Sequence, residues 1–283
     1  AGPSLVTTIK SILAQTARPL IKEIVIVLDG SSLKPEIIKQ LPTDLVQVFQ
    51  QPNQLGQSAR LNDLFQAASG ELLVVTNDDV VLAPTAVAEL AAAATHAADL
   101  VSGQALPFPS RHWLGKLLAV GYQLNHHLVA LQPTPSYLSC NGRLLALKKS
   151  FYKNVQLPEQ LWNNDAFLYF AAQQQKRRYY HQPAAVVRFQ SPSTLAEHQR
   201  QSLKFQLSRS ENEAYFGPLN AAYAVPRGRL ALALLITGLA HPLLTPCYVL
   251  LLVWTRLLPR PTRPTSGVWP TDRSTKQLPG GQS

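Results

Sequence analysis

The chain has 283 residues, of which 46% are hydrophobic and 15% charged, which is enough apolar content for one sizeable folded core. Its net charge of +10 favours an anionic partner such as a membrane surface, a phosphate-bearing small molecule or nucleic acid. Cys140 and Cys247 lie far apart without metal-ligand spacing, which argues against a disulfide framework or a zinc site and fits a reducing, cytosolic setting.

The first third of the chain alternates between two hydrophobic periods. Apolar residues at helical spacing predict a helix over residues 4–16, and the continuous β-branched run at 24–28 predicts a strand covered on both faces. Further patterns predict a helical stretch at 35–40, a strand at 45–50, a turn and helix over 53–71, and a third strand over 71–79. This order predicts an α/β fold with a doubly wound, mostly parallel sheet and flanking helices.

Acidic residues follow two of these predicted strands. Asp29 ends the first, and the stretch Asn77, Asp78 and Asp79 ends the third. In doubly wound sheets, ligands bind beyond the carboxyl ends of the strands. One interpretation of the second stretch is a polar turn, since Asn and Asp favour turns. The other is a site for a divalent cation, which the delivery of carboxylates by two strands to one sheet edge favours.

The middle of the chain predicts further elements and one candidate base. These elements are helices at 85–98, 111–131, 161–175 and 193–216, strands at 99–105 and 179–189, and a strand–turn–strand unit at 137–152. The helix at 111–131 has a character that suits a membrane surface. Between residues 100 and 196 only Glu159 and Asp165 carry a carboxylate, so the choice of a carboxylate base is narrow. The alternative for Asp165 is a helix N-cap.

The C-terminal part is strongly apolar. Residues 230–258 carry no charge until Arg256 and are long enough to cross a bilayer, but Pro242 and Pro246 interrupt them. We predict an interfacial helix to about residue 240 and a shorter transmembrane helix through Trp254, with a buried helix pair as the alternative. The positive-inside rule places the following basic residues in the cytoplasm: Arg256, Arg260, Arg263, Arg273 and Lys276. Residues 259–283 are rich in Pro, Thr, Ser and Gly, which predicts a basic, disordered tail.

Five stretches in a fixed order carry a family resemblance. They are SLVTTIKSILAQT with EIVIVLDGSS, then NQLGQSARLN, TNDDVVLAP, CNGRLLALKKS with LWNNDAFLYF, and QSLKF. Together they resemble the membrane-associated, inverting glycosyltransferases of family 2, which have the GT-A fold. The resemblance covers about residues 4–216 and implies that the family's first strand is absent from this chain.

The resemblance implies a donor half over residues 1–105. Asn77 stands where the family has the first Asp of its Asp-x-Asp motif, and Asp79 stands where it has the second. Asp79, with Asn77, would hold Mg²⁺ or Mn²⁺ on the sugar-nucleotide diphosphate, because hard cations prefer oxygen ligands. The residues implied for nucleotide binding in this half are Asp29, Asn53, Gly56, Arg60 and Asp78.

The resemblance implies an acceptor half over residues 106–228, followed by an interfacial and transmembrane region over 229–258. Asp165 would be the general base. Gln201, Lys204 and Phe205 resemble the family's Gln-x-x-Arg-Trp motif, with Lys in place of Arg and Phe in place of Trp, and would contact the donor.

The implied function is transfer of a sugar, most simply from a UDP-sugar, to a hydroxyl of a lipid-linked or glycan acceptor. The setting would be cell-envelope, exopolysaccharide or glycolipid synthesis at the cytoplasmic face of the inner membrane. One alternative is a degenerate nucleotide-binding protein, because Asn77 removes one charge from the metal site. A second is a processive polysaccharide synthase, although the chain offers at most one or two membrane helices. A nucleic-acid partner is not expected, because the Lys and Arg residues are scattered without an aromatic-interleaved patch.

Overall fold

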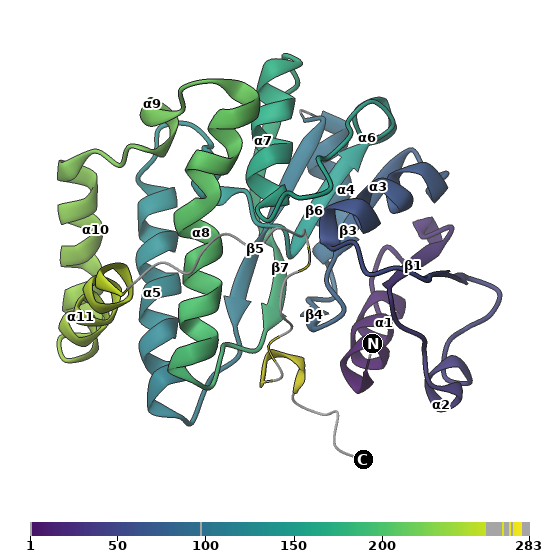
Figure 1. Ribbon diagram of the computed structural model, residues 1–283, viewed down its shortest axis with the longest axis horizontal. Helices are drawn as coiled ribbons and strands as arrows, with labels where there is room; N and C mark the ends of the chain where they lie inside the picture. Colours follow the sequence, from purple (N-terminus) through teal and green to yellow (C-terminus); the bar gives the residue numbers. More distant parts are fainter. Residues whose placement is uncertain (1, 97, 259–267, 269–271, 273, 279–283) are drawn as a thin grey trace.

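The predicted alternation of helices and strands is confirmed in the computed structural model of the chain, which describes residues 2–96, 98–258, 268, 272 and 274–278 (Figure 1). The strands are β1 (Ile24–Asp29), β2 (Val46–Gln51), β3 (Leu72–Thr76), β4 (Val80–Leu82), β5 (Leu100–Pro107), β6 (Leu144–Lys148) and β7 (Tyr179–Phe189). The α-helices are α1 (Pro3–Leu13), α2 (Pro35–Ile38), α3 (Gln57–Ala67), α4 (Ala86–His96), α5 (Trp113–Ala130), α6 (Lys149–Tyr152), α7 (Asn164–Gln174), α8 (Leu195–Phe216), α9 (Asn220–Tyr223), α10 (Arg227–Ala240) and α11 (Leu244–Leu257).

The strands of the described residues form two sheets rather than one. β1 and β2 pair in parallel, and the larger sheet has the order β3-β6-β5-β7-β4. Within the larger sheet β5 and β7 run parallel, whereas β3–β6, β5–β6 and β4–β7 are antiparallel. The prediction of a mostly parallel sheet is therefore wrong. A continuously apolar strand indicates that both faces are buried, and a mixed sheet covered by helices on both faces buries its strands in the same way.

β6 shows how the larger sheet builds a core on each face. Leu144 and Ala146 pack into the cluster that includes α4, and Leu145 and Leu147 pack into the cluster that includes α7. All four side chains are buried, because successive residues of a strand point to opposite faces. The sheet is therefore a rigid layer, with helices on both sides and loops at its edges.

Two segments differ from their predicted form. Residues 137–152 were predicted as strand, turn and strand, but contain one strand, β6, between a 3₁₀ turn (Tyr137–Ser139) and the short helix α6. The chain before β6 is tied to β5 by a side chain instead of a ladder, since Ser102 Oγ donates to Ser139 O and accepts from Asn141 N. The predicted strand over 71–79 ends at Thr76, and the three residues that follow form the turn to β4.

The helices α5, α10 and α11 lie together at one side of the molecule (Figure 1). The chain turns after Ala240, near Pro242, so the apolar stretch forms two helices of 14 residues each. A 14-residue helix is about 21 Å long, whereas a bilayer's hydrocarbon core is about 30 Å thick. In the parts of the chain that the structure describes, we find no helix that combines the length and the apolar character needed to cross a membrane. The transmembrane helix predicted to run through Trp254 is thus not found.

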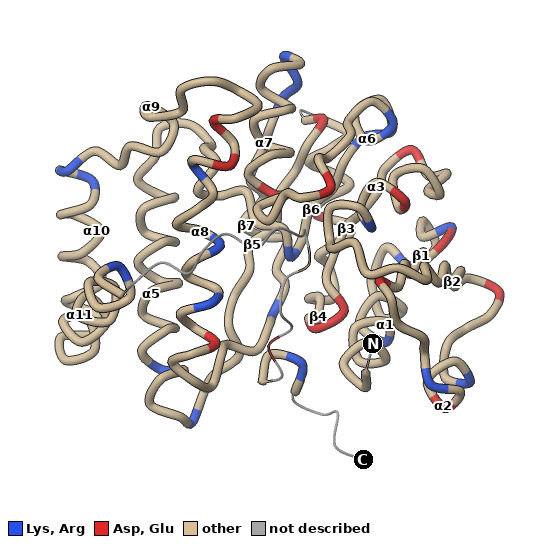
Figure 2. The backbone as a smooth tube through the Cα atoms, viewed as in Figure 1, with Lys and Arg blue, Asp and Glu red and all other residues tan. Residues whose placement is uncertain are grey.

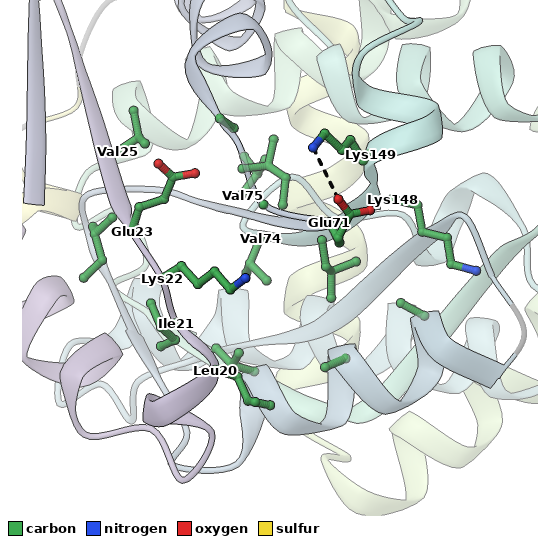
Figure 3. Close-up of a pocket in the computed structure, with 18 of the residues that line it drawn as sticks. Leu20, Ile21, Lys22, Glu23, Val25, Glu71, Val74, Val75, Lys148 and Lys149 are labelled. Atoms are coloured by element: carbon green, nitrogen blue, oxygen red, sulfur yellow. Dashed lines mark hydrogen bonds and ion pairs between the residues drawn. The ribbon is translucent and has the colours of Figure 1, made fainter. Parts of the chain in front are cut away.

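A cavity of about 630 Å³ separates the two sheets (Figure 3). It is lined by Ile24 and Val25 of β1 and by Val74 and Val75 of β3, with the Glu71–Lys149 ion pair nearby. β1 and β3 each pair with a strand on one side only, so each is an edge strand of its sheet. None of the residues predicted for donor binding or catalysis lines this cavity. The predicted site residues therefore lie elsewhere in the fold.

Candidate donor and acceptor site

Three of the residues predicted to bind the nucleotide meet at the end of β1. Asp29 accepts hydrogen bonds from the backbone N–H groups of Leu55 (2.8 Å) and Gly56 (3.0 Å). Arg60 Nε lies 3.1 Å from Asp29 Oδ1. Gly56 begins α3 with φ of 99°, a conformation that favours glycine. Three of the predicted residues are therefore brought together, while Asn53 is exposed on the loop before α3.

A shallow hollow lies beside Asp29 and is formed by the turn after β1. Gly30 has φ of 61°, and a Cβ added there would come within 2.8 Å of Gln54 Cβ, so this turn needs glycine. The lining residues are Gly30, Ser31, Ser32, Gln50, Gln51 and Pro52. The hollow is polar and open, as a surface for a nucleoside would be.

The turn between β3 and β4 directs two carboxylates at one positive group. Lys276 Nζ forms an ion pair with Asp78 Oδ1 and lies 3.2 Å from Asp79 Oδ2. Burial works to lower the pKa of Lys276, but the two carboxylates outweigh it and raise this pKa above its ordinary value. The amine therefore stays charged at neutral pH. The stretch is thus a turn whose two carboxylates contact the ammonium of Lys276.

The position of Lys276 indicates whether Asp78 and Asp79 could hold a divalent cation. Lys276 Nζ is a stand-in cation, and its position shows that oxygens of Asp78 and Asp79 can converge on one centre. Such oxygens are the ligands that Mg²⁺ and Mn²⁺ prefer. The predicted ligands were Asp79 and Asn77, and Asp78 was predicted to contact the nucleotide, but it is Asp78 that shares the ammonium with Asp79. Within the same residues, no three His, Cys, Asp or Glu side chains are grouped as a metal site. The two carboxylates fit such an ion.

Asp165, the predicted base, lies in the first turn of α7. The N-cap is Asn163, whose side chain accepts from Ala166 N, so Asp165 is not the cap of this helix. Asp165 Oδ2 instead accepts a hydrogen bond from Gly142 N at 3.0 Å. The side chain is half-buried at a helix N-terminus, where the helix dipole stabilises a negative charge.

The start of α7 is held by a residue that the sequence analysis missed. Glu211 of α8 is 3% exposed, and its two carboxylate oxygens accept from Trp162 N (2.8 Å) and Asn163 N (2.9 Å). Asn163 is the N-cap of α7, whose N–H a helix leaves without a partner, and Trp162 directly precedes it. Glu211 thus fixes the turn that presents Asp165. Its sequence gave no signal, because a Glu in a polar helix is usually solvated.

One loop connects the base to the carboxylate turn. Thr76 is the last residue before that turn, and its Oγ1 donates to Arg143 O at 2.8 Å. The preceding residue, Gly142, donates its N–H to Asp165. The Arg143 guanidinium in turn lies 4.0 Å from the centroid of the Phe189 ring. The fold therefore holds Asp165 and the β3–β4 turn on the same loop, although they lie about 90 residues apart in the chain.

The three predicted residues on α8 have different environments. Burial lowers the pKa of the Lys204 amine, the nearby Asp165 works against this effect, and Arg143 adds to it. Lys204 therefore lies in the electrostatic surroundings of the candidate base. Gln201 donates to Asp272 Oδ2 at 3.2 Å, beside the ion pair of Arg200 with Asp272. Phe205 is 60% exposed, so it does not pack into the site in this structure.

Comparisons with known proteins bear on the family and the fold. Residues 1–118, which include Asp29 and the carboxylate turn, match the model of glycosyl transferase family 2. The chain is similar in fold to a mannosyltransferase, PcManGT from Pyrobaculum calidifontis, whose structure was solved with GDP-Man and Mn²⁺. The TM-score is 0.57 at 17% identity, over 92% of this chain and 73% of that one.

Two structures of S. aureus TarS are also similar. Its fragment 1–349 in complex with UDP-GlcNAc aligns with a TM-score of 0.52 at 14% identity, over 90% of this chain and 84% of that one. A longer TarS chain aligns with a TM-score of 0.52 at 16% identity, and 89% of this chain covers half of it (50%). At such identities these structures establish a shared fold. No curated protein matches the chain in sequence. The first 118 residues thus match glycosyltransferase family 2, and the chain as a whole shares the GT-A-like fold of these solved structures.

Proposed function

We propose that the chain transfers a sugar from a UDP-sugar to an acceptor hydroxyl, with inversion at the anomeric carbon. The observation that carries this proposal is the loop that joins Thr76 and Asp165, through Arg143 and Gly142. It sets a candidate base beside a pair of carboxylates that already bind a positive group. These are the two parts that an inverting transfer with a diphosphate leaving group needs.

In this proposal the donor lies across the ends of β1 and β3. The nucleoside occupies the hollow next to Asp29, and the diphosphate lies at the β3–β4 turn. A Mg²⁺ or Mn²⁺ ion held by Asp78 and Asp79 would neutralise the charge that develops on the leaving diphosphate. Arg200 and Lys204 of α8 add positive charge from the protein itself.

Asp165 acts on the acceptor. Its carboxylate removes the proton from the acceptor hydroxyl while that oxygen bonds to the anomeric carbon. The bond from the anomeric carbon to the diphosphate oxygen breaks at the same time, and its electron pair leaves with the nucleoside diphosphate. Gly142 N–H holds Oδ2 in place, so the carboxylate is oriented before the acceptor binds.

The decisive experiment is a calorimetric titration of UDP into the full chain, with and without Mn²⁺. We expect binding that depends on Mn²⁺ and is weakened in Asp79→Ala. Asp44→Ala is the matched control, because Asp44 is an exposed carboxylate on the loop before β2. A parallel titration with GDP tests whether the site prefers uracil or guanine as the nucleobase. If neither nucleotide binds in the presence of Mn²⁺, the proposed donor site is wrong.

A second candidate function is nucleotide binding without turnover. The ion pair of Lys276 with Asp78 favours it, because this pair uses an oxygen that a metal would need. Release of UDP from a UDP-sugar with a hydroxyl acceptor separates the two candidates. The length distribution of the product then distinguishes a single transfer from processive synthesis of a polysaccharide.

We also propose that the acceptor is lipid-linked or a glycan of the cell envelope, reached at an anionic membrane surface on the cytoplasmic side. α10, α11 and the turn between them leave large apolar side chains exposed, including Leu239 of α10 and Leu243 of the turn. Basic residues lie at the start of α10 and near the end of α11, among them Arg227 and Arg256 (Figure 2). An apolar patch with a basic rim suits the interface of a bilayer with anionic lipids.

Vesicle sedimentation tests this membrane proposal. We expect the full chain to bind vesicles of mixed phosphatidylglycerol and phosphatidylcholine more tightly than vesicles of phosphatidylcholine alone. Leu243→Glu should weaken this binding by about tenfold or more, since burying one leucine contributes about 1.5–3 kcal/mol. Leu20→Glu is the control, because Leu20 is 71% exposed and lies before β1 while Leu243 is 82% exposed. Equal binding by both variants, or self-association in place of vesicle binding, would contradict the proposal.

A further inference from the structure

We propose that the C-terminal segment (Asp272 and Ser274–Leu278) is an autoinhibitory strap, which fills the donor site by placing Lys276 where a cation would bind and Asp272 where a phosphate would bind. The inference rests on the proposed function, because it assigns the diphosphate and its cation to this edge of the sheet. It adds a regulatory contact made by the chain itself.

Lys276 competes with a divalent cation for the same oxygens. Its amine contacts Asp78 Oδ1 and Asp79 Oδ2, so a metal ion cannot use these oxygens until the amine leaves. One ammonium neutralises only one of the two carboxylate charges. A divalent cation neutralises both, and therefore can displace the lysine when its concentration is sufficient.

Asp272 competes with an anion at the other side of the same edge. Its carboxylate is nearly buried (5% exposed) and accepts from Arg200 Nε at 3.0 Å and from Arg200 Nη2 at 2.6 Å. Gln201 Nε2 donates to the second oxygen at 3.2 Å. Guanidinium groups bind carboxylates and phosphates through the same donors. A donor phosphate that reached Arg200 and Gln201 would have to replace Asp272.

Further contacts hold the segment in the position that brings Asp272 and Lys276 to the site. Ser274 N donates to Glu197 Oε1 at 3.2 Å, and the Ser274 hydroxyl contacts Glu197 Oε2. Ser193 N donates to Ser274 Oγ at 3.0 Å, and Leu278 is buried. The contacts are mostly polar and lie at the surface of α8. The strap can therefore leave without opening either core of the sheet.

The consequence is a donor site that is open in only a fraction of the molecules. When a binding-competent state is fractionally populated, the apparent affinity falls by that fraction. Removing the lysine should raise the affinity for Mn²⁺, even though it removes no group from the metal site. The strap should also leave when Mn²⁺ and a nucleoside diphosphate bind together.

The first experiment measures Mn²⁺ binding alone, from the electron paramagnetic resonance signal of the free ion. We expect Lys276→Ala to bind Mn²⁺ about tenfold more tightly than the wild type, as for an open state populated at about a tenth. Gln277→Ala is the control in the same segment, because the Gln277 side chain is exposed, and it should match the wild type. An unchanged, weaker or undetectable Mn²⁺ affinity in Lys276→Ala overturns the inference.

The second experiment follows the strap by hydrogen exchange of peptides that cover residues 272–278 in the full chain. The amides of Ser274 and Gln277 are hydrogen-bonded and should be protected. Mn²⁺ with UDP or GDP should remove this protection, and so should Lys276→Ala. Turnover of a donor while the strap stays protected would overturn the inference and leave the proposed function intact. Release of the strap by Mn²⁺ and nucleotide without turnover would support the inference while the transfer proposal fails.

Discussion

The two acidic sites of this protein are held in different ways. Asp165 is bound by the backbone N–H of Gly142, 23 residues away in the chain, on a loop anchored to the sheet. Asp78 is bound by the side chain of Lys276, 198 residues away, on a segment attached to the surface of α8. The first partner cannot leave without unfolding the loop, whereas the second can leave once the polar contacts of its segment break. We infer that the base is oriented permanently and that access to the donor site is reversible.

The largest expected effect comes from removing the carboxylate of Asp165, the candidate base. Asp165→Asn keeps the shape of the side chain but cannot accept a proton, so kcat should fall by about 10²–10⁴-fold. Binding of UDP with Mn²⁺ should remain, because the donor carboxylates are intact. Glu159→Gln is the control, since Glu159 is the other carboxylate of this region and is exposed. Full turnover by Asp165→Asn would show that this residue is not the base.

The next largest effect is expected from Glu211, which holds the start of α7 and so positions Asp165. Glu211→Gln replaces one carboxylate oxygen by an NH₂ group that faces a backbone N–H of Trp162 or Asn163. We expect the free energy of unfolding to fall by about 1–3 kcal/mol, the cost of an unsatisfied buried group. In enzyme that remains folded, kcat should fall while KM changes little, because α7 no longer presents Asp165 correctly.

Urea unfolding and steady-state kinetics give the two quantities for Glu211→Gln. Glu36→Gln, at an exposed position of α2, is the matched control and should change neither. A loss of stability without a change in kcat would mean that Glu211 supports the fold alone. The Gly142 contact would then be the only interaction known to orient Asp165.

The sequence predicted those features that depend on local patterns. Helices and strands follow hydrophobic periods, so most elements were placed within a few residues. The proximity of Asp29 to Gly56 and Arg60 was also predicted, because the resemblance assigns all three residues to the nucleotide pocket. Sheet direction was missed, since a strand buried on both faces has the same pattern in parallel and in mixed sheets.

The contacts that distinguish the two sites were not predictable from local patterns. Glu211 has the surroundings of a solvated residue in a polar helix, and only the tertiary fold places it under the start of α7. Lys276 lies in a stretch rich in Pro, Thr, Ser and Gly, for which a disordered tail was predicted. Most of residues 259–271 and 279–283 lie outside the described residues. Those that the structure describes, Asp272 and Ser274–Leu278, pack against α8 and the carboxylate turn.

The smallest expected effect tests the reversible site by pH. Burial works to raise the pKa of Glu197, but hydrogen bonds from Ser274, Ser193 and Thr194 lower it below its ordinary value of 4.5. Of these bonds, only those from Ser274 are lost when the strap leaves. A carboxyl group whose pKa is lower when the strap is bound stabilises the bound state fully above the pKa of the released state. That contribution is lost as pH falls through the lowered value. The strap should therefore keep its protection down to about pH 5 and lose part of it below pH 4.5.

The measurement is the protection factor of the 272–278 peptides, corrected for the intrinsic exchange rate at each pH. Other charged groups at this contact, Asp272, Lys276 and Arg200, are common to the wild type and to Glu197→Gln. The difference between these two proteins therefore isolates Glu197. We expect Glu197→Gln to start from weaker protection and to lose less of it in acid, because an amide does not titrate. Identical pH profiles would mean that Glu197 does not contribute to the attachment of the strap. The strap would then be held by its two ion pairs, through Asp272 and Lys276 alone.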